Sequence, residues 1–179
     1  MNILIFTALY PAPKEYGIPN DTKVVHYYAR QWKDAGHNVH VIFMHLTSVR
    51  DLLRFKGLNK IFGSESDYEY EGIKVHLLDC QMLRPGVSRL SCLQAKSINK
   101  KISTFITSLP SPDKVFVHFP SCFTGIKSAY GFECPTMAVL HNVDASLLQK
   151  TPSLLSEIRE YKNLGGRNKN RYRFGGITF

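Results

Sequence analysis

The hydrophobic pattern of the first part of the chain predicts a strand, a helix and a second strand. Residues 2–7 are almost continuously apolar, which is typical of a parallel strand buried on both faces. A helix-spaced apolar stripe follows and ends at Gly36, a residue suited to a left-handed helix cap. Residues 39–44 form the next apolar run. Two parallel strands joined by a helix make a right-handed βαβ unit. The stripe consists of Val25, Tyr28, Ala29, Trp32 and Ala35, and we expect Asp21 to cap the start of this helix.

The same alternation of strands and helices continues along the chain. It predicts strands at 73–78, 114–118, 136–140 and 172–179, an edge segment at 68–72, and helices at 48–62, 91–109, 121–130 and 152–163. We predict an α/β fold with a Rossmann-like, doubly wound parallel sheet in a single domain. The first five strands should lie in the order third, second, first, fourth, fifth, with any further strands outside them.

The loop after the first strand, residues 8–20, contains Pro11, Pro13 and Pro19, and Gly17 is its only glycine. A dinucleotide site would instead place three glycines in a short turn at this point. The absence of that motif disfavours a Rossmann oxidoreductase. We expect this loop to reach outward over a binding site.

Histidines follow or end several of the predicted strands. His45, His118 and His141 occupy such positions, and Asn142 and Asp144 come directly after the last of them. In doubly wound sheets ligands bind beyond the carboxyl ends of the strands, near the point where strand order reverses. We therefore expect the ligand site at this edge of the sheet.

Composition narrows the class of protein. The chain has 179 residues, which favours one domain, and no apolar run is long enough for a signal peptide or a membrane span. Its cysteines, Cys80, Cys92, Cys122 and Cys134, show neither paired nor metal-ligand spacing. We predict free thiols, no metal site and a cytoplasmic location.

The formal net charge of +9 is concentrated in two segments, at 50–60 and 162–173. Such segments are either solvated faces or contacts with an anionic partner, such as the headgroups at the inner face of the membrane. Aromatic residues are not interleaved with the basic ones, which disfavours nucleic acid.

The order of these motifs resembles the N-terminal domain of retaining GT-B glycosyltransferases, the large family that includes sucrose synthases and bacterial mannosyltransferases. The resemblance covers nearly the whole chain. It is carried by the segments at 3–7, 10–13 with Gly17, 35–42, 71–75, 112–120 and 135–144, and by the terminal segment at 174–179.

The resemblance implies that residues 1–179 are the acceptor-side domain of such an enzyme. The donor-binding domain, with its paired-glutamate motif, is absent from this chain. The full-length enzyme would transfer a hexosyl group from a nucleotide sugar to a glycan or lipid-linked acceptor without a metal or other cofactor, and this chain alone would be inactive.

The resemblance also implies roles for particular residues. His141 is similar to the family's histidine at the end of the fifth strand, so it is the candidate catalytic residue, or else it caps a loop. Gly17 is similar to the glycine whose N–H approaches the donor phosphate or acceptor, or else it is a turn glycine. Asp144 either orients His141 or caps the next segment, and Asn142 lies beside them. His118 lines the cleft floor, and Lys14 either meets an anionic acceptor or is solvated. The alternative function is a non-catalytic module whose basic segments dock on a membrane or another anionic partner.

Overall fold

The computed structural model describes residues 1–18, 22–48, 61–82, 92–119 and 132–140. Its elements in chain order are β1 (Asn2–Thr7), η1 (Lys14–Tyr16), α1 (Val24–Asp34), β2 (Asn38–Ser48), β3 (Ser64–Tyr70), β4 (Ile73–Met82), α2 (Cys92–Ser108), β5 (Lys114–Phe119) and β6 (Thr136–Leu140). The predicted helices at 48–62, 121–130 and 152–163 and the strand at 172–179 lie wholly or mainly outside these residues, as do the basic segments at 50–60 and 162–173.

The described strands form one sheet in the order β3-β4-β2-β1-β5-β6. Neighbouring strands from β4 to β6 are parallel, which confirms the Rossmann-like α/β fold and the predicted order of the first five strands. The additional strand, β3, pairs antiparallel with β4 because the two-residue turn Glu71-Gly72 joins them.

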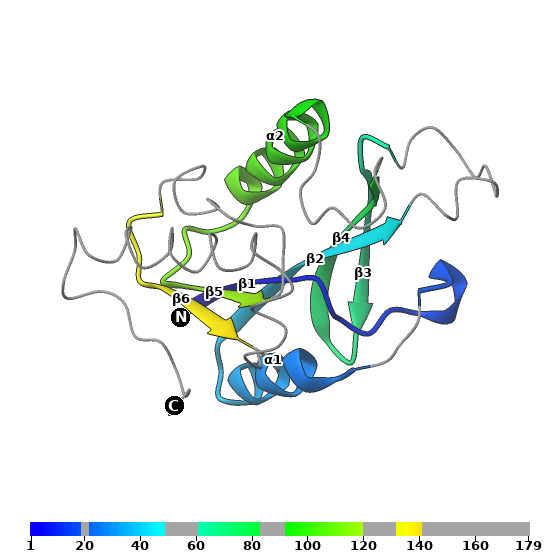
Figure 1. Cartoon of the computed structure of the whole chain (residues 1–179). Helices are drawn as coiled ribbons and strands as arrows, with labels where there is room; N and C mark the ends of the chain where they lie inside the picture. The colour runs from blue at the N-terminus through cyan, green and yellow to red at the C-terminus, as the bar shows by residue number, and fades with distance from the viewer. Residues whose placement is uncertain (19–21, 49–60, 83–91, 120–131, 141–179) are drawn as a thin grey trace, which may run out of the picture.

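Helices α1 and α2 cover opposite faces of the sheet (Figure 1). Strand residues alternate between the faces, so each strand contributes to two separate cores. The core under α1 includes Ile3, Ile5, Val25, Ala29, Val41, Phe43, Val75 and Leu77. The core under α2 includes Leu4, Phe6, Ile42, Met44, Leu78, Ile98, Ile102, Val115 and Val117.

The loop after β1 does not reach outward as expected. Tyr10, Pro11, Ala12 and Ile18 are buried, and the loop packs into the core under α1. The Tyr68 hydroxyl of β3 donates a hydrogen bond of 2.8 Å to the Pro11 carbonyl and fixes the loop along the sheet. Tyr10, Pro11, Ala12 and Ile18 of this loop therefore extend the core, which the sequence interpretation missed.

The end of α1 agrees with the prediction and its start does not. Gly36 has φ 82, its N–H bonds to Lys33, and the His37 N–H bonds to Trp32, as in a Schellman cap. The N-cap position falls at Lys23, so Asp21 is not the cap residue. Within α1 the buried residues are Val25, His26 and Ala29, and His26 was not predicted.

None of the described helices is long and apolar enough to cross a membrane. Cys80 and Cys134 are not in disulfide bonds, as predicted for these two cysteines.

Candidate functional site

The strand order reverses between β1 and β5. The chain proceeds from β1 to β2 and β4 on one side, then returns to β5 and β6 on the other. Phe6 and Val117 are register partners, so Thr7, the last residue of β1, lies beside His118, the penultimate residue of β5, at the carboxyl edge. This is the position at which doubly wound sheets bind ligands.

Thr7 and His118 form a buried floor at this position. Thr7 follows Ile5 on the face that packs against α1, and His118 follows Phe116 on the same face. Their exposed fractions are 1% and 3%. The Thr7 hydroxyl donates to the Leu9 carbonyl and accepts from the Leu9 N–H, which fixes the turn out of β1. His118 thus lies near the carboxyl end of β5, and its role as the floor of a ligand site stays a prediction.

A histidine–carboxylate pair lies on the same face within β2 and β4, three residues before each strand ends. His45 and Asp79 are register partners, and His45 Nδ1 lies 3.2 Å from Asp79 Oδ1. Their side chains are 19% and 10% exposed. A carboxylate that bonds one ring nitrogen fixes the tautomer and orientation of the imidazole. The sequence interpretation placed His45 at the end of the second strand, but β2 continues to Ser48 because its pairing with β4 extends that far, and Asp79 was not identified as the partner of His45.

Aromatic rings connect β5 to α1 beneath this edge. Trp32 stacks on Phe116 with ring centroids 4.4 Å apart, and one helical turn earlier Tyr28 lies 6.5 Å from His118. Tyr28 and Trp32 also contact each other at 6.3 Å. These contacts, between Phe116 and His118 of β5 and Trp32 and Tyr28 of α1, position the His118 ring.

Lys14 and Gly17 lie at the exposed tip of the loop after β1 and are not brought together with His118. Tyr16, between them, contacts Tyr68 of β3 with ring centroids 5.3 Å apart. Strand β3 is four strand spacings from β5, or roughly 19 Å. Gly17 has φ 62, and its N–H already bonds to the Lys14 carbonyl at 3.0 Å. These features fit a turn glycine. His141, Asn142 and Asp144 lie outside the described residues.

A buried hydrogen-bonded chain ties the loop after β1 to α1 and to the β3–β4 turn. The Tyr10 hydroxyl lies 3.0 Å from His26 Nδ1, and His26 Nε2 lies 3.0 Å from the Glu71 carboxylate. When the ring is neutral, Nε2 donates to the carboxylate and Nδ1 accepts from Tyr10. Burial raises the pKa of Tyr10 far above its ordinary value, so this hydroxyl stays protonated. The helical spacing of His26 with Ala29 was the available sequence signal for its burial.

Glu71 lies in a strained turn, and several positively charged side chains surround its carboxylate. Glu71 and Gly72 both have positive φ, 46 and 80, as a two-residue type I′ hairpin turn requires. Arg30 lies 2.8 Å from the Glu71 carboxylate and Lys23 lies 3.8 Å from it. The hydrogen bond from His26, together with the charges of His26, Lys23 and Arg30, lowers the pKa of Glu71.

We expect Glu71→Gln to lower stability at neutral pH but not in acid. Because the folded-state pKa is depressed, the contribution of Glu71 is complete above the ordinary pKa of 4.5 and is lost as pH falls through the lower folded value. Urea unfolding of wild type and variant should therefore converge between pH 4.5 and the acid limit. Glu69→Gln, an exposed change on β3, is the matched control. A difference that is the same at all pH values would contradict this role.

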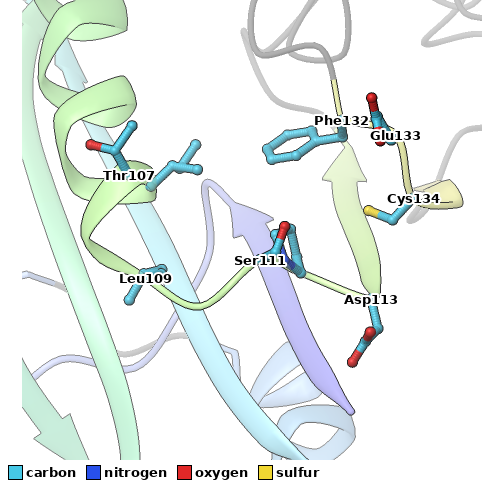
Figure 2. A pocket seen from close by; sticks show the side chains of 9 residues that line it. Thr107, Leu109, Ser111, Asp113, Phe132, Glu133 and Cys134 are labelled. Carbon is cyan, nitrogen blue, oxygen red and sulfur yellow. The ribbon is translucent and has the colours of Figure 1, made fainter.

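Two surface hollows lie away from the carboxyl edge. The larger, about 720 Å³, lies at the amino ends of β5 and β6 (Figure 2) and is lined by Ile106, Thr107, Leu109, Ser111, Pro112, Asp113, Phe132, Glu133 and Cys134. The Asp113 carboxylate there accepts a 2.7 Å hydrogen bond from the Asn2 backbone, so it serves the fold. The smaller, about 380 Å³, lies on the α2 face beside His40, His76 and Phe105. Neither hollow contains the predicted site residues.

The described residues contain no cluster of His, Cys, Asp and Glu side chains suited to a metal ion. Burial, with the charge of Asp79, raises the pKa of the Cys80 thiol to about 11. This thiol is therefore protonated near neutral pH and is a poor nucleophile. The chemistry available at the described carboxyl edge is hydrogen bonding and proton exchange by imidazole and carboxylate groups.

Comparison with known proteins gives a weak structural likeness. No family model and no curated protein matches the chain. Among solved structures, an α,α-trehalose-phosphate synthase (UDP-forming) from Burkholderia vietnamiensis is similar, with 10% sequence identity and a TM-score of 0.47. The match covers 89% of this chain and 37% of that chain. A likeness at this level assigns no function to the chain.

Proposed function

We propose that the chain is the acceptor-binding half of a sugar-nucleotide-dependent retaining glycosyltransferase. The observation that carries the proposal is the placement of His118 and Thr7 at the strand-order reversal between β1 and β5. An imidazole at this edge suits the hydroxyls of a sugar, and the Thr7 hydroxyl, bonded to Leu9, fixes the turn beside it. The resemblance of the sequence motifs to GT-B N-terminal domains supports the same reading, with His141 as the catalytic group and no metal.

The proposal includes a donor-binding domain that completes the enzyme, with residues 1–179 as one acceptor-side domain. Large apolar side chains are exposed at the carboxyl edge, among them Leu9 at 49% and Val24 at 44%. Interdomain surfaces resemble protein interfaces and carry such residues. Their position supports a domain that covers this edge.

The histidine rings offer a direct test by NMR. His45 and His118 lie on the α1 face near the carboxyl edge, whereas His40 and His76 lie on the α2 face. We expect UDP-glucose, GDP-mannose or a neutral disaccharide to shift the ring signals of His118 and His45 and to leave those of His40 and His76 in place. Signals would be assigned from single His→Gln variants.

The proposal would be contradicted if only the ring signals of His40 and His76 shifted. It would also be contradicted if no ring signal shifted with any sugar or nucleotide sugar. Retention on anionic vesicles that falls with salt, without any response to sugars, would instead identify a membrane-docking module. A second assay would mix the chain with its donor-binding domain and follow transfer of labelled sugar. Transfer by the chain alone would contradict its proposed inactivity.

A further inference from the structure

Helix α1 has two sides of different character. Its positively charged side chains point toward the loop between β3 and β4. There Lys23 and Arg30 form ion pairs with Glu71, and Lys33 donates a hydrogen bond to the Gly72 carbonyl. Among the described residues, each of these positive charges therefore has a partner on that side. None of them is available to hold an anion on the side of α1 that faces β5.

The side that faces β5 is aromatic. Trp32 stacks on Phe116, and Tyr28 lies against both Trp32 and His118. His118 is 3% exposed, whereas Tyr28 is 44% exposed. The row of rings therefore ends in one accessible aromatic face directly beside the imidazole at the strand-order reversal.

An accessible aromatic ring such as that of Tyr28 has the chemistry of a stacking surface for a sugar. The C–H groups on one face of a pyranose are apolar and pack on a flat ring, while its rim of hydroxyls needs donors and acceptors. A phosphate group needs cations or clustered N–H groups, and the described cations of α1 are engaged elsewhere. The surroundings thus favour an uncharged ligand over an anionic one.

We propose that Tyr28 is the stacking platform for a neutral sugar ring of the acceptor, with the buried His118 ring packed beside it. The inference rests on the proposed glycosyltransferase function and narrows its acceptor. The acceptor is recognised at this point through an uncharged pyranose and not through a phosphate. Tyr28 is a binding residue in this scheme and takes no part in bond making or breaking.

The chain supplies its own reporter for this site. Trp32 is the one tryptophan of the sequence, and its ring lies 6.3 Å from that of Tyr28. Titration with methyl α-D-glucopyranoside, methyl α-D-mannopyranoside or maltose should therefore change the tryptophan fluorescence. Inorganic phosphate and vesicles of phosphatidylglycerol and phosphatidylcholine are titrated in parallel.

Variants on one helix separate stacking from general effects. Tyr28→Ala should weaken saccharide binding about tenfold, the scale of a lost stacking contact, and Tyr28→Phe should bind nearly as wild type. Tyr27→Ala is the matched control, because Tyr27 is 59% exposed but its ring contacts His26 on the other side of α1. If the alanine variant does not fold, Tyr28→Leu replaces it, because leucine fills the space of the side chain without providing a flat ring for stacking.

Loss of binding in Tyr28→Ala and Tyr28→Leu, with retention in Tyr28→Phe and Tyr27→Ala, supports the inference. Equal saccharide affinity in every variant, no saccharide response in wild type, or a response to phosphate alone would overturn it. Transfer assays on the complete enzyme keep the two proposals apart. There Tyr28→Ala should raise the acceptor KM about tenfold and leave the donor KM unchanged. If transfer occurs and Tyr28→Ala leaves the acceptor KM unchanged, only the proposed role of Tyr28 is refuted. If no transfer occurs at all, the proposed glycosyltransferase function is refuted.

Discussion

His141→Ala should lower the turnover of the complete enzyme by about 10²–10⁴, the usual range for a positioned acid–base or polar group. His141 lies outside the described residues, but it directly follows β6, the neighbour of the strand that carries His118. In the proposed function a neutral imidazole here donates to a sugar hydroxyl and shares the charge that develops in the transition state. It forms no covalent bond.

The control for this variant is a change of the same type at the opposite edge of the sheet. His37 lies in the turn between α1 and β2, at the amino edge, and His37→Ala should leave turnover near that of wild type. Steady-state kinetics and a melting curve would be measured for both variants. Near-normal turnover for His141→Ala means that the residue only caps a loop. A variant that does not fold means that His141 serves stability.

The parallel part of the sheet was predictable because each of its strands is an apolar run. Strands β1, β4, β5 and β6 begin within a residue of the predicted positions, and their order followed from the general rules for doubly wound sheets. The left-handed conformation of Gly36 was predictable for a similar reason, since glycine after a helical stripe is a local signal.

Strand β3 was predicted only in part, as the edge segment at 68–72, because its sequence SESDYEY alternates between intermediate and exposed positions and contains no apolar run. Features that depend on distant partners escaped the sequence interpretation. The buried His26 is stabilised by Tyr10 and Glu71, which are far from it in sequence. The loop after β1 was expected to reach outward, yet its contacts with β3 and α1 bring it into the core. Pairings across such separations leave no local periodicity.

The candidate site was predictable at the level of the sheet edge and less so at the level of contacts. The position of His118 near the end of β5 was predictable, because the end of a buried strand is visible in the sequence. Which residues surround it depends on how α1 lies across the sheet, and the ring contacts of Tyr28 and Trp32 became evident only in three dimensions. The same spatial information separates Lys14 and Gly17 from His118.

Phe6→Ala should lower the free energy of unfolding by about 3–5 kcal/mol, the usual cost of truncating a buried phenylalanine. Phe6 is fully buried at 0% exposed, in the core under α2, where its ring lies 6.3 Å from that of Phe132. Its register partners are Ile42 and Val117, so the cavity would open at the centre of the sheet, where neighbouring strands limit collapse.

Phe62→Ala is the matched control, because Phe62 is 50% exposed and its truncation should change stability by no more than about 0.5 kcal/mol. Urea unfolding followed by circular dichroism measures both variants. Phe6 alternates onto the face opposite to Thr7, so the folded Phe6→Ala variant should keep the saccharide response of Trp32. A loss below 1 kcal/mol would show that the core under α2 repacks without Phe6. An unchanged melting curve with a lost saccharide response would place Phe6 in the site and contradict the separation of the two faces.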